Sequence, residues 1–382
     1  MDFTLTKQQI KLKDAVKKFC EIEFNSDYSL QLDKTETFPM DLYKKATKQG
    51  FSSLVIPETY GGRGQGYLAA CLAMEELCRN DSSLGLACMI GTFGSELILF
   101  FGTEEQKFQY LKPLCRGEKI SAAAFTEPFS GTDITNVDTV AVNQGNDWII
   151  NGTKTLITNA PIADFFIVLC QTASNNSPRK GQSLLIVNRE TEGLVIRKLL
   201  GKMGIRCVTT GEVVFKDVKV PNNNLIGEKN NGYRQSMDFF TVSRILIAAQ
   251  AVGTAQGAFE IALKYAKKRE SSGQPIIKFQ QIGAKLAQVA SEIEAARLLT
   301  YKAALSIDKN KLDSMLTSMA KLIASKAAVR ATDSAIQTLG GYGYLEGYKV
   351  ERAYRDAKVT EIYEGTSEIQ RLAILKQLIK KY

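Results

Sequence analysis

The sequence predicts a mixed α+β protein in which two helical segments flank a β segment. Apolar residues recur at helical spacing over 1–120 and again over 232–382, whereas 121–231 carries short runs of β-forming residues between Asn, Gly, Asp and Pro. These runs do not alternate with helices, so a parallel doubly wound sheet is not expected. We therefore expect an N-terminal helical domain, a central antiparallel β domain or small barrel, and a C-terminal helical domain with these bounds.

The first domain opens with a helix that Thr6 and Gln9 are placed to cap, because a threonine followed three residues later by a glutamine forms a capping box. A second helix is expected over 39–50. Further helices are expected over 67–118, the last of them capped by Thr103.

A glycine cluster at 61–64 separates these helices. It lacks the G-x-G-x-x-G spacing of a dinucleotide-binding loop and lies between helical segments, so we interpret it as a turn.

The β segment and the second helical segment are predicted from composition. Runs rich in Val, Ile, Leu and Phe mark five strands, at 140–142, 148–150, 165–169, 184–187 and 213–215. Alanine-rich stretches that are apolar over much of their surface mark three long helices, at 245–267, 282–305 and 315–339.

The chain of 382 residues contains no histidine. This excludes Ser-His-Asp and Cys-His catalysis, histidine-ligated haem and the His-containing zinc sites. A general base must therefore be Glu, Asp, Lys, Tyr or Cys, and any redox chemistry must come from a cofactor.

The seven cysteines are scattered, odd in number and form no C-x-x-C pair. This argues against a disulfide framework or a thiolate metal site and favours a reducing compartment. Residues 1–14 contain no apolar signal segment, and no run of 18 uncharged apolar residues occurs, so we expect a cytoplasmic protein without a membrane span.

The net charge of +9 is spread over many lysines. Such a surface suits anionic ligands such as phosphates or CoA. Nucleic acid is disfavoured as a partner, because the chain has no block of five or six like charges.

Glu364 is the candidate general base. It stands between Tyr363 and Gly365 and before Thr366, in a pattern typical of a partly desolvated acid on a turn, and desolvation raises a carboxyl pKa toward neutrality. A glutamate at a loop-to-helix junction can equally cap the helix or pair with an arginine.

The string QTLGGYGYLEGYKVERAYRDAKVTEIYEGTSEIQR at 337–371 resembles the C-terminal signature of the acyl-CoA dehydrogenase family. Segments 125–133, 154–159, 201–221 and 269–280 also resemble family motifs, so the similarity covers nearly the whole chain. The resemblance implies a C-terminal four-helix bundle, an FAD cofactor, a homotetramer or dimer, and electron transfer to an electron-transfer flavoprotein.

The resemblance also implies which residues hold FAD. One loop runs past the flavin, one strand flanks its ring, and further residues contact the pyrophosphate, the FAD of a partner subunit or the cofactor's other side. These residues are, in chain order, Phe125, Thr126, Gly131, Thr132, Ile157, Thr158, Arg269, Gln337, Gly340, Gly341, Thr366 and Glu368.

By the same resemblance Glu364 removes the α-proton of an acyl thioester while a hydride leaves the β-carbon for flavin N5, which gives a trans-2-enoyl thioester. The position of the base matches the branches that act on short-chain or branched acyl groups. The implied substrate contacts are Thr132, Thr241, Arg244, Tyr363 and Gly365.

Three residues depart from the family pattern. Leu156 stands where an aromatic is common, and Ser272 replaces a phenylalanine that stacks on the cofactor. Thr241 replaces the acid of a D-x-x-R motif on the helix that meets CoA. Ser243, just before Arg244, shows that the alternative family base is absent.

Other functions are compatible with this sequence. Thr241 keeps open a dehydrogenase that acts on an acyl group bound to an acyl or peptidyl carrier protein, and an oxidase that uses oxygen. A DNA-associated relative would bind duplex DNA in a salt-sensitive way, but the retained Glu364 does not support it.

Overall fold

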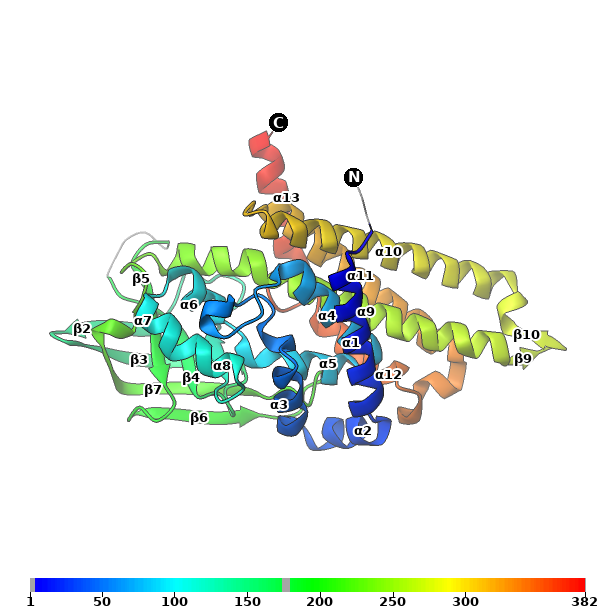
Figure 1. The fold of residues 1–382 in the computed structure, drawn as a ribbon, viewed down its shortest axis with the longest axis horizontal. Coiled ribbons are helices and arrows are strands. Elements are labelled where there is room, and N and C mark those ends of the chain that lie inside the picture. Colours follow the sequence, from blue (N-terminus) through cyan, green and yellow to red (C-terminus); the bar gives the residue numbers. More distant parts are fainter. Residues whose placement is uncertain (1–3, 174–178, 382) are drawn as a thin grey trace.

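The computed structural model describes residues 4–173 and 179–381. Its N-terminal part is helical (Figure 1). The helices are α1 (Lys7–Glu23), α2 (Ser26–Thr35), α3 (Met40–Lys48), α4 (Gly66–Asn80), α5 (Ser82–Met89), α6 (Ser95–Phe101), α7 (Glu104–Gln106) and α8 (Lys112–Cys115). The capping box of Thr6 and Gln9 is confirmed, and Thr103 caps α7 in a second box with Gln106.

The sequence analysis missed α2. Asn25 caps this helix by accepting hydrogen bonds from the backbone N–H groups of Asp27 and Tyr28. The Asn-Ser-Asp string was the available signal, since an asparagine N-cap followed by an acid in the first turn favours a helix start.

The glycine cluster at 61–64 is a turn, as predicted. Gly61 has φ 87° and ends a short 3₁₀ helix. The short helical turns of the chain are η1 (Phe51–Ser53), η2 (Glu58–Tyr60), η3 (Ile90–Thr92), η4 (Lys107–Leu111, a π-helix), η5 (Asn222–Asn224), η6 (Ile276–Lys278), η7 (Gly340–Tyr344) and η8 (Glu346–Tyr348).

The central part forms one sheet with the strand order β6-β7-β3-β2-β4-β5-β8, and β1 pairs with β4. Its strands are β1 (Ser121–Ala124), β2 (Val140–Gln144), β3 (Asp147–Thr158), β4 (Phe165–Gln171), β5 (Gln182–Asn188), β6 (Leu194–Leu199), β7 (Thr210–Pro221) and β8 (Leu225–Ile226). Pairing is antiparallel except at β4, which runs parallel to β1 and meets β2 in one parallel pair.

The five predicted strands are present, and three others escaped the sequence analysis. β1 is Ser-Ala-Ala-Ala, which has no β-forming residue, and it becomes a strand because it is fully buried beside β4. β6 alternates partly buried and exposed residues, and β8 has only two residues.

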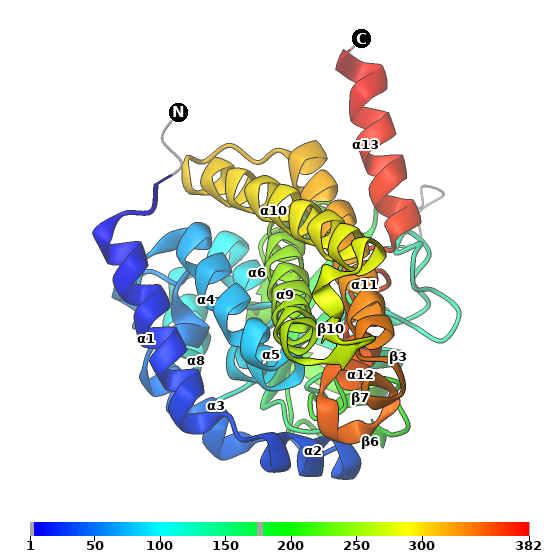
Figure 2. The same ribbon diagram turned by 90° about the vertical axis from the view of Figure 1, so that its right-hand side faces the viewer.

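The C-terminal part is helical. Its helices are α9 (Gly232–Lys268), α10 (Gln280–Asp308), α11 (Ser314–Leu339), α12 (Val350–Val359) and α13 (Ser367–Lys381), and the hairpin β9 (Glu270–Ser271) and β10 (Gln274–Pro275) joins α9 to α10. The three long helices pack together, with α4 of the first domain against α9. Figures 1 and 2 show α13 projecting away from the body of the molecule.

Two stretches, Ser82–Phe101 and Gly232–Lys268, have the length and hydropathy of a membrane span. In each, most of the apolar window is buried inside the fold, at 67% and 72%. Core helices of soluble proteins have the same composition, so these stretches are weak evidence for a membrane span. All seven cysteines are buried and form no disulfide.

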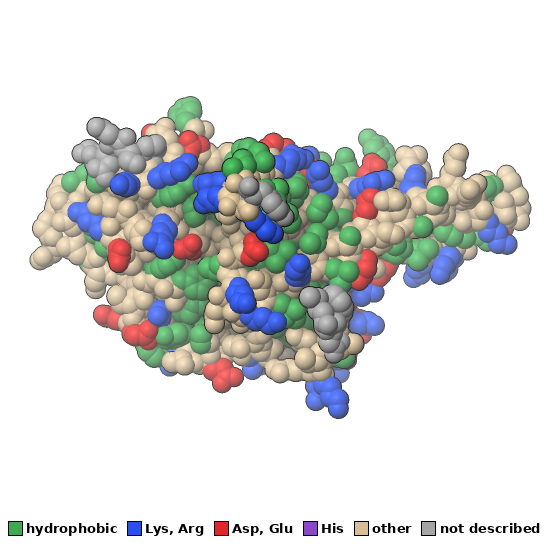
Figure 3. All heavy atoms as spheres, turned by 90° about the horizontal axis from the view of Figure 1, so that it is seen from above, with side chains coloured by type: hydrophobic (Ala, Val, Ile, Leu, Met, Phe, Trp, Pro, Cys, Tyr) green, Lys and Arg blue, Asp and Glu red, His purple; other side chains and the backbone are tan. Residues whose placement is uncertain are grey.

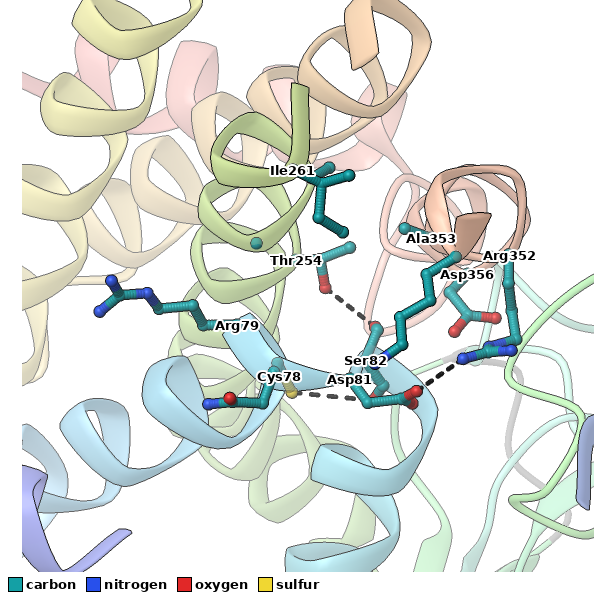
Figure 4. A pocket seen from close by; sticks show the side chains of 13 residues that line it. Cys78, Arg79, Asp81, Ser82, Thr254, Ile261, Arg352, Ala353 and Asp356 are labelled. Atoms are coloured by element: carbon teal, nitrogen blue, oxygen red, sulfur yellow. Dashed lines mark hydrogen bonds and ion pairs between the residues drawn. The ribbon is translucent and has the colours of Figure 1, made fainter. Parts of the chain in front are cut away.

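A buried cluster of charges joins the three parts of the fold (Figure 4). Asp81, at the junction of α4 and α5, accepts hydrogen bonds from Arg352 of α12 and from Ser29 of α2, at 2.8 and 2.6 Å. Asp356 of α12 accepts from the backbone of Ile205, at 2.6 Å, and from Ser83. A cavity of about 30 Å³ lies beside them. The cluster therefore fixes α12, which leads into Glu364.

Asp356 makes the stability of this protein depend on pH. Burial, with the charge of Asp81 adding to it, raises the Asp356 pKa to about 7. The folded state therefore holds a proton that the unfolded state releases above about pH 4. The contribution of Asp356 to the free energy of unfolding is fully present below that pH. It falls, by at most about 1.4 kcal/mol per pH unit, as the pH rises to about 7.

We expect Asp356→Asn to remove this dependence, because the amide is neutral and keeps an acceptor for Ile205 N–H. In urea unfolding at several pH values, the free energy of unfolding of the variant should increase relative to that of the wild type as the pH rises. A constant difference between the two would contradict the prediction.

Candidate functional site

Glu364 and Gly365 form a left-handed turn between α12 and α13. Their φ angles are 54° and 89°, and the first is uncommon for a residue other than glycine. Thr366 directly precedes α13, and its hydroxyl accepts a hydrogen bond from Ile369 N–H at 3.3 Å. Glu368, in the first turn of α13, is exposed and pairs with Arg371 at 2.9 Å.

Three helices hold this turn through its carbonyl oxygens. We call it the catalytic turn (Glu364–Gly365), because Glu364 is the predicted base. Arg244 of α9 donates its Nε–H to the Glu364 carbonyl at 3.2 Å. Gln370 of α13 donates to both carbonyls, at 3.1 and 2.9 Å. Lys321 of α11 donates to the Gly365 carbonyl at 2.7 Å. These bonds fix the backbone that carries the glutamate.

The carboxylate of Glu364 accepts a hydrogen bond from the Ser243 hydroxyl. Removal from water raises the Glu364 pKa above its ordinary value, while the Ser243 hydrogen bond and the charges of Arg244 and Lys321 oppose the rise. A carboxylate with a raised pKa on a fixed backbone is suited to accept a proton.

Three of the predicted substrate residues are hydrogen-bonded to other parts of the protein, and two of them lie beside the catalytic turn. The Tyr363 hydroxyl donates to the side chain of Gln250, and burial raises the Tyr363 pKa well above its ordinary range. Arg244 is 7% exposed and bonds the turn. Thr241 donates its hydroxyl to the Met237 carbonyl of its own helix, at 2.9 Å.

A second group of predicted residues lies where β3 meets the loop after β1. The Thr155 N–H donates to the Thr126 carbonyl at 2.9 Å. Lys154 is fully buried, and its Nζ donates to the Phe125 carbonyl at 3.0 Å and to Glu127 Oε1 at 2.8 Å. The loop and the strand that are predicted to flank the flavin are therefore tied together by an ion pair.

Glu127 also holds the far side of the loop. Its carboxylate accepts the backbone N–H groups of Asp138 and Thr139 at 2.6 and 2.9 Å. Burial raises the Glu127 pKa, but the Lys154 charge and these hydrogen bonds outweigh it and leave the pKa below its ordinary value. Burial lowers the Lys154 pKa, with Glu127 opposing. The pair is a buried ion pair.

The other predicted flavin residues differ in exposure. Ile157 is 2% exposed and directs its side chain into the core, whereas Thr158 is half-buried. Gly131 and Thr132 are exposed on the loop. Leu156 has φ 56° and is 64% exposed, so the aliphatic side chain that replaces the family's aromatic points to solvent in this chain.

An aromatic cluster connects the loop to the helix of Ser243 and Arg244. Phe125 stacks on Phe239 at 5.8 Å between ring centroids and meets Phe240 at 5.0 Å. Phe93 contacts Phe239 at 5.6 Å. Phe239 and Phe240 lie on α9 within four residues of Ser243, so the cluster forms an apolar wall on the helix that also bonds the Glu364 carboxylate.

A third group lines a cavity of about 540 Å³ where α9 and α11 end. Arg269, Gln337, Gly340 and Gly341 are among its lining residues, and all four are exposed. No ion pair within residues 4–173 and 179–381 includes Arg269. Figure 1 shows the neighbouring β9–β10 hairpin at the end of the molecule away from the sheet.

These residues fit an extended anionic cofactor. A Cβ added at Gly340 or Gly341 would meet no atom within 4 Å, so packing in this chain does not explain the glycines. Backbone left uncovered beside an arginine suits the close approach of a pyrophosphate. Ser272, which replaces the stacking phenylalanine, has φ 50° in the turn of the hairpin.

We expect Gly341→Ala to lower the affinity for FAD by about tenfold or more, because the added methyl would occupy the space the cofactor approaches. Folding of the apoprotein should be unaffected, since the methyl meets nothing in this chain. Flavin fluorescence titration would measure the affinity and thermal unfolding the stability.

Gly347→Ala is the matched control. Gly347 also has open space around it and does not line the cavity. Equal FAD affinity in the two variants would show that the cavity does not hold the cofactor.

Sequence reasoning missed Lys321 and Gln370, which bond the catalytic turn, and Gln250, which bonds the neighbouring Tyr363. One signal was available for Lys321: it lies in Met-Ala-Lys-Leu-Ile-Ala, on the face of α11 that is otherwise apolar or small. A lysine at such a position needs a buried partner. The two glutamines carry no comparable signal.

The surface drawn in Figure 3 mixes Lys and Arg side chains with acidic and apolar ones. The basic residues form no single patch on that face. Across the described part of the chain, no group of three His, Cys, Asp or Glu side chains is arranged to hold a metal ion.

Family models match almost the whole chain. The acyl-CoA dehydrogenase N-terminal domain matches residues 6–118, the middle domain 122–218 and the C-terminal domain 230–379. Among curated relatives, a probable acyl-CoA dehydrogenase (YngJ) of Bacillus subtilis is 42% identical over 381 residues, and a short-chain specific acyl-CoA dehydrogenase of Clostridium acetobutylicum is 41% identical over 381 residues. Both alignments cover 100% of each chain.

A third relative is the caffeyl-CoA reductase-Etf complex subunit CarC of Acetobacterium woodii, 38% identical over 98% of this chain and 99% of its own.

Solved structures share the fold. Butyryl-CoA dehydrogenase from Megasphaera elsdenii has a TM-score of 0.95 at 37% identity, covering 99% of this chain and 100% of that one. A chain in a structure concerned with the electron transferring flavoprotein of Acidaminococcus fermentans has a TM-score of 0.96 at 38% identity, covering 100% of both. The prolyl acyl carrier protein oxidase AnaB has a TM-score of 0.92 at 34% identity, covering 98% of this chain and 100% of its own.

These matches confirm the resemblance and the predicted order of a helical, a β and a helical domain. With all three domains matched in order and relatives above 40% identity over the whole length, this chain belongs to the acyl-CoA dehydrogenase family of FAD-dependent oxidoreductases.

Proposed function

We propose that this protein oxidises short-chain or branched acyl-CoA thioesters to trans-2-enoyl thioesters, with Glu364 as the base. The observation that carries the proposal is the catalytic turn. Among the residues that the structure describes, the desolvated carboxylate has one hydrogen-bond partner, a serine hydroxyl, and three helices hold the backbone. A carboxylate presented in this way can accept a carbon-bound proton without moving its backbone.

The backbone of the catalytic turn offers a donor for the substrate. No hydrogen bond within the described ranges uses the Glu364 N–H. This N–H is therefore free to bond the thioester carbonyl, and polarisation of that carbonyl acidifies the α-carbon. The α-proton passes to a Glu364 oxygen, its C–H electrons form the double bond, and the β-hydrogen leaves as hydride. FAD, when bound, accepts that hydride.

Two sets of residues hold FAD in this proposal. The first comprises the loop and strand braced by Lys154 and Glu127, with Phe125, Thr126, Gly131, Thr132, Ile157, Thr158, Thr366 and Glu368. The second lines the cavity of Arg269 and contacts the cofactor of a neighbouring copy. The distance of the hairpin from the sheet supports a homo-oligomer, most simply a homotetramer, in which each FAD touches two chains (Figure 1).

The acyl group lies against the aromatic wall of Phe93, Phe239 and Phe240. The similarity to enzymes named for short-chain acyl-CoA and butyryl-CoA supports short substrates. An electron-transferring flavoprotein is the proposed acceptor, since two similar proteins are described together with one. We place the protein in the cytoplasm.

A carrier-bound acyl group is the alternative substrate. Thr241 stands where the family has an acid, and its hydroxyl is used by its own helix. The fold is also that of an enzyme acting on prolyl acyl carrier protein.

Anaerobic reduction tests both possibilities. The purified yellow protein is mixed with butyryl-CoA, isobutyryl-CoA or octanoyl-CoA, and the visible flavin band is followed. Fast bleaching with the first two supports the proposal. A flavin that stays oxidised with each of them but bleaches with a butyryl carrier protein supports the alternative.

A further inference from the structure

Lys321 is buried completely in the middle of α11. Its Nζ makes a hydrogen bond of 2.7 Å to the Gly365 carbonyl, one residue after Glu364. A lysine is rarely buried without a carboxylate partner, because an unpaired ammonium loses its hydration. Among the ion pairs of the described residues, none includes Lys321.

The groups around Lys321 show what its charge acts on. Arg244 of α9, the other buried cation of this site, lowers the Lys321 pKa. Among the acids, Glu364 raises that pKa most, and Glu361 and Glu368 raise it less. Arg244 likewise lacks an ion pair in the described part of the chain and feels Glu364. Two buried cations therefore bond the backbone of the turn that carries the predicted base, and the charge of each favours its ionised carboxylate.

Glu364 faces a further acid. Glu96 of α6 is buried, and desolvation with a contribution from Glu364 raises its pKa to about 7. A negative Glu96 would oppose ionisation of Glu364, as burial does. The charges that favour the ionised base are those of Arg244 and Lys321, together with the Ser243 hydrogen bond.

We propose that Lys321 is a positioning residue for the reaction: its ammonium holds the catalytic turn in its left-handed conformation and keeps the Glu364 carboxylate ionised, and so sets the pH range in which the α-proton can be removed. The inference rests on the proposed function, since it takes Glu364 as the base. Lys321 acts through the turn and does not touch substrate.

The two roles of Lys321 are separable. Gln370 also donates to the Gly365 carbonyl, so this oxygen keeps a partner when Lys321 is replaced. The charge has no such substitute except Arg244. A neutral side chain at 321 should therefore raise the pKa of the base more than it disorders the turn.

Burial lowers the Lys321 pKa to about 8. Most of the Lys321 side chain is therefore protonated at neutral pH. The charge is lost in mildly alkaline solution, where the carboxylate of the base is ionised without it. The effect of Lys321 should be seen on the acid side of the profile.

The test is the pH dependence of anaerobic flavin bleaching by butyryl-CoA in wild type, Lys321→Met and Lys321→Arg. In the methionine variant the acid limb of the pH–rate profile should move to higher pH by about one unit or more, because the loss of a nearby charge shifts a carboxyl pKa by that amount. At a given pH on this limb, the rate should fall about tenfold for each unit by which the pKa of the base rises. The arginine variant should retain most of the wild-type limb.

Lys326→Met is the matched control, because Lys326 lies on the same helix and is exposed. Its profile should superimpose on that of the wild type. If Lys321→Met does not yield folded protein with FAD, Lys321→Gln, which keeps an N–H donor and lacks the charge, carries the same test.

The outcomes separate the two proposals. A wild type that no acyl-CoA bleaches would overturn the proposed function. A wild type that bleaches, with Glu364→Gln inactive and the acid limb unshifted in the neutral variants at position 321, would overturn the role of Lys321 alone. A loss of rate that is equal at every pH would assign Lys321 to folding only.

Discussion

Replacing Glu364 by glutamine should lower the rate of anaerobic flavin bleaching by butyryl-CoA by about 10² to 10⁴-fold, the range that general base catalysis supplies. Glutamine has nearly the same shape and can still accept the Ser243 hydrogen bond. The backbone contacts of the catalytic turn do not involve the carboxylate, so they should persist. FAD content and the thermal midpoint should therefore stay close to those of the wild type. Rapid-mixing absorbance at the flavin band measures the loss of bleaching rate.

Glu361→Gln is the control for this change. Glu361 lies three residues earlier and pairs with Lys358 at 2.7 Å, so it does not reach the catalytic turn in the same way. Its rate should match the wild type. A Glu364→Gln variant that bleaches within tenfold of the wild type would mean that another group removes the proton.

Replacing Lys154 by methionine should give the largest loss of stability, about 3 to 5 kcal/mol, because Glu127 would keep a buried charge without its partner. The Nζ bond to the Phe125 carbonyl would also be lost, so the loop predicted to run past the flavin would loosen. A fall in melting temperature of about 5 °C is expected. Differential scanning calorimetry and the flavin-to-protein absorbance ratio measure the two effects.

Two companion variants make this prediction specific. Lys219→Met breaks the exposed pair of Lys219 with Asp147 in the same sheet and should cost at most about 1 kcal/mol. Lys154→Met/Glu127→Gln removes both charges and should recover part of the loss, since no unpaired charge remains buried. A single Lys154 variant as stable as the Lys219 variant would show that the buried pair contributes little.

Sequence patterns predicted those parts of the fold whose order is local. Capping by Thr6 and Thr103 and the long apolar helices could be read directly, because their signals lie within one turn or one face. β1 could not be predicted, because the tetrapeptide Ser-Ala-Ala-Ala becomes a strand only through its neighbour β4. The start of α9 at Gly232 was missed for a related reason: its first turns pack against the sheet.

The site shows the same division. Glu364 could be proposed from its neighbours in sequence, and its partial burial and raised pKa agree with that expectation. Its partners Ser243 and Lys321 come from two helices that are distant in sequence and reach the turn only after folding, whereas Gln370 lies in the adjoining helix α13. The resemblance to the family implied that Arg244 and Thr241 belong to the site. It did not indicate that Arg244 bonds the backbone of the turn or that Thr241 bonds its own helix.

The left-handed conformation of Glu364 ties activity to a cost in stability. An L-residue other than Gly, Asn or Asp held at a φ of 54° is strained by about 1 kcal/mol or more. The chain retains a glutamate there, next to Gly365, which adopts such angles without strain. At this one position selection for turnover and selection for a robust fold therefore act in opposite directions, and a search for more stable variants would tend to choose glycine and lose the enzyme.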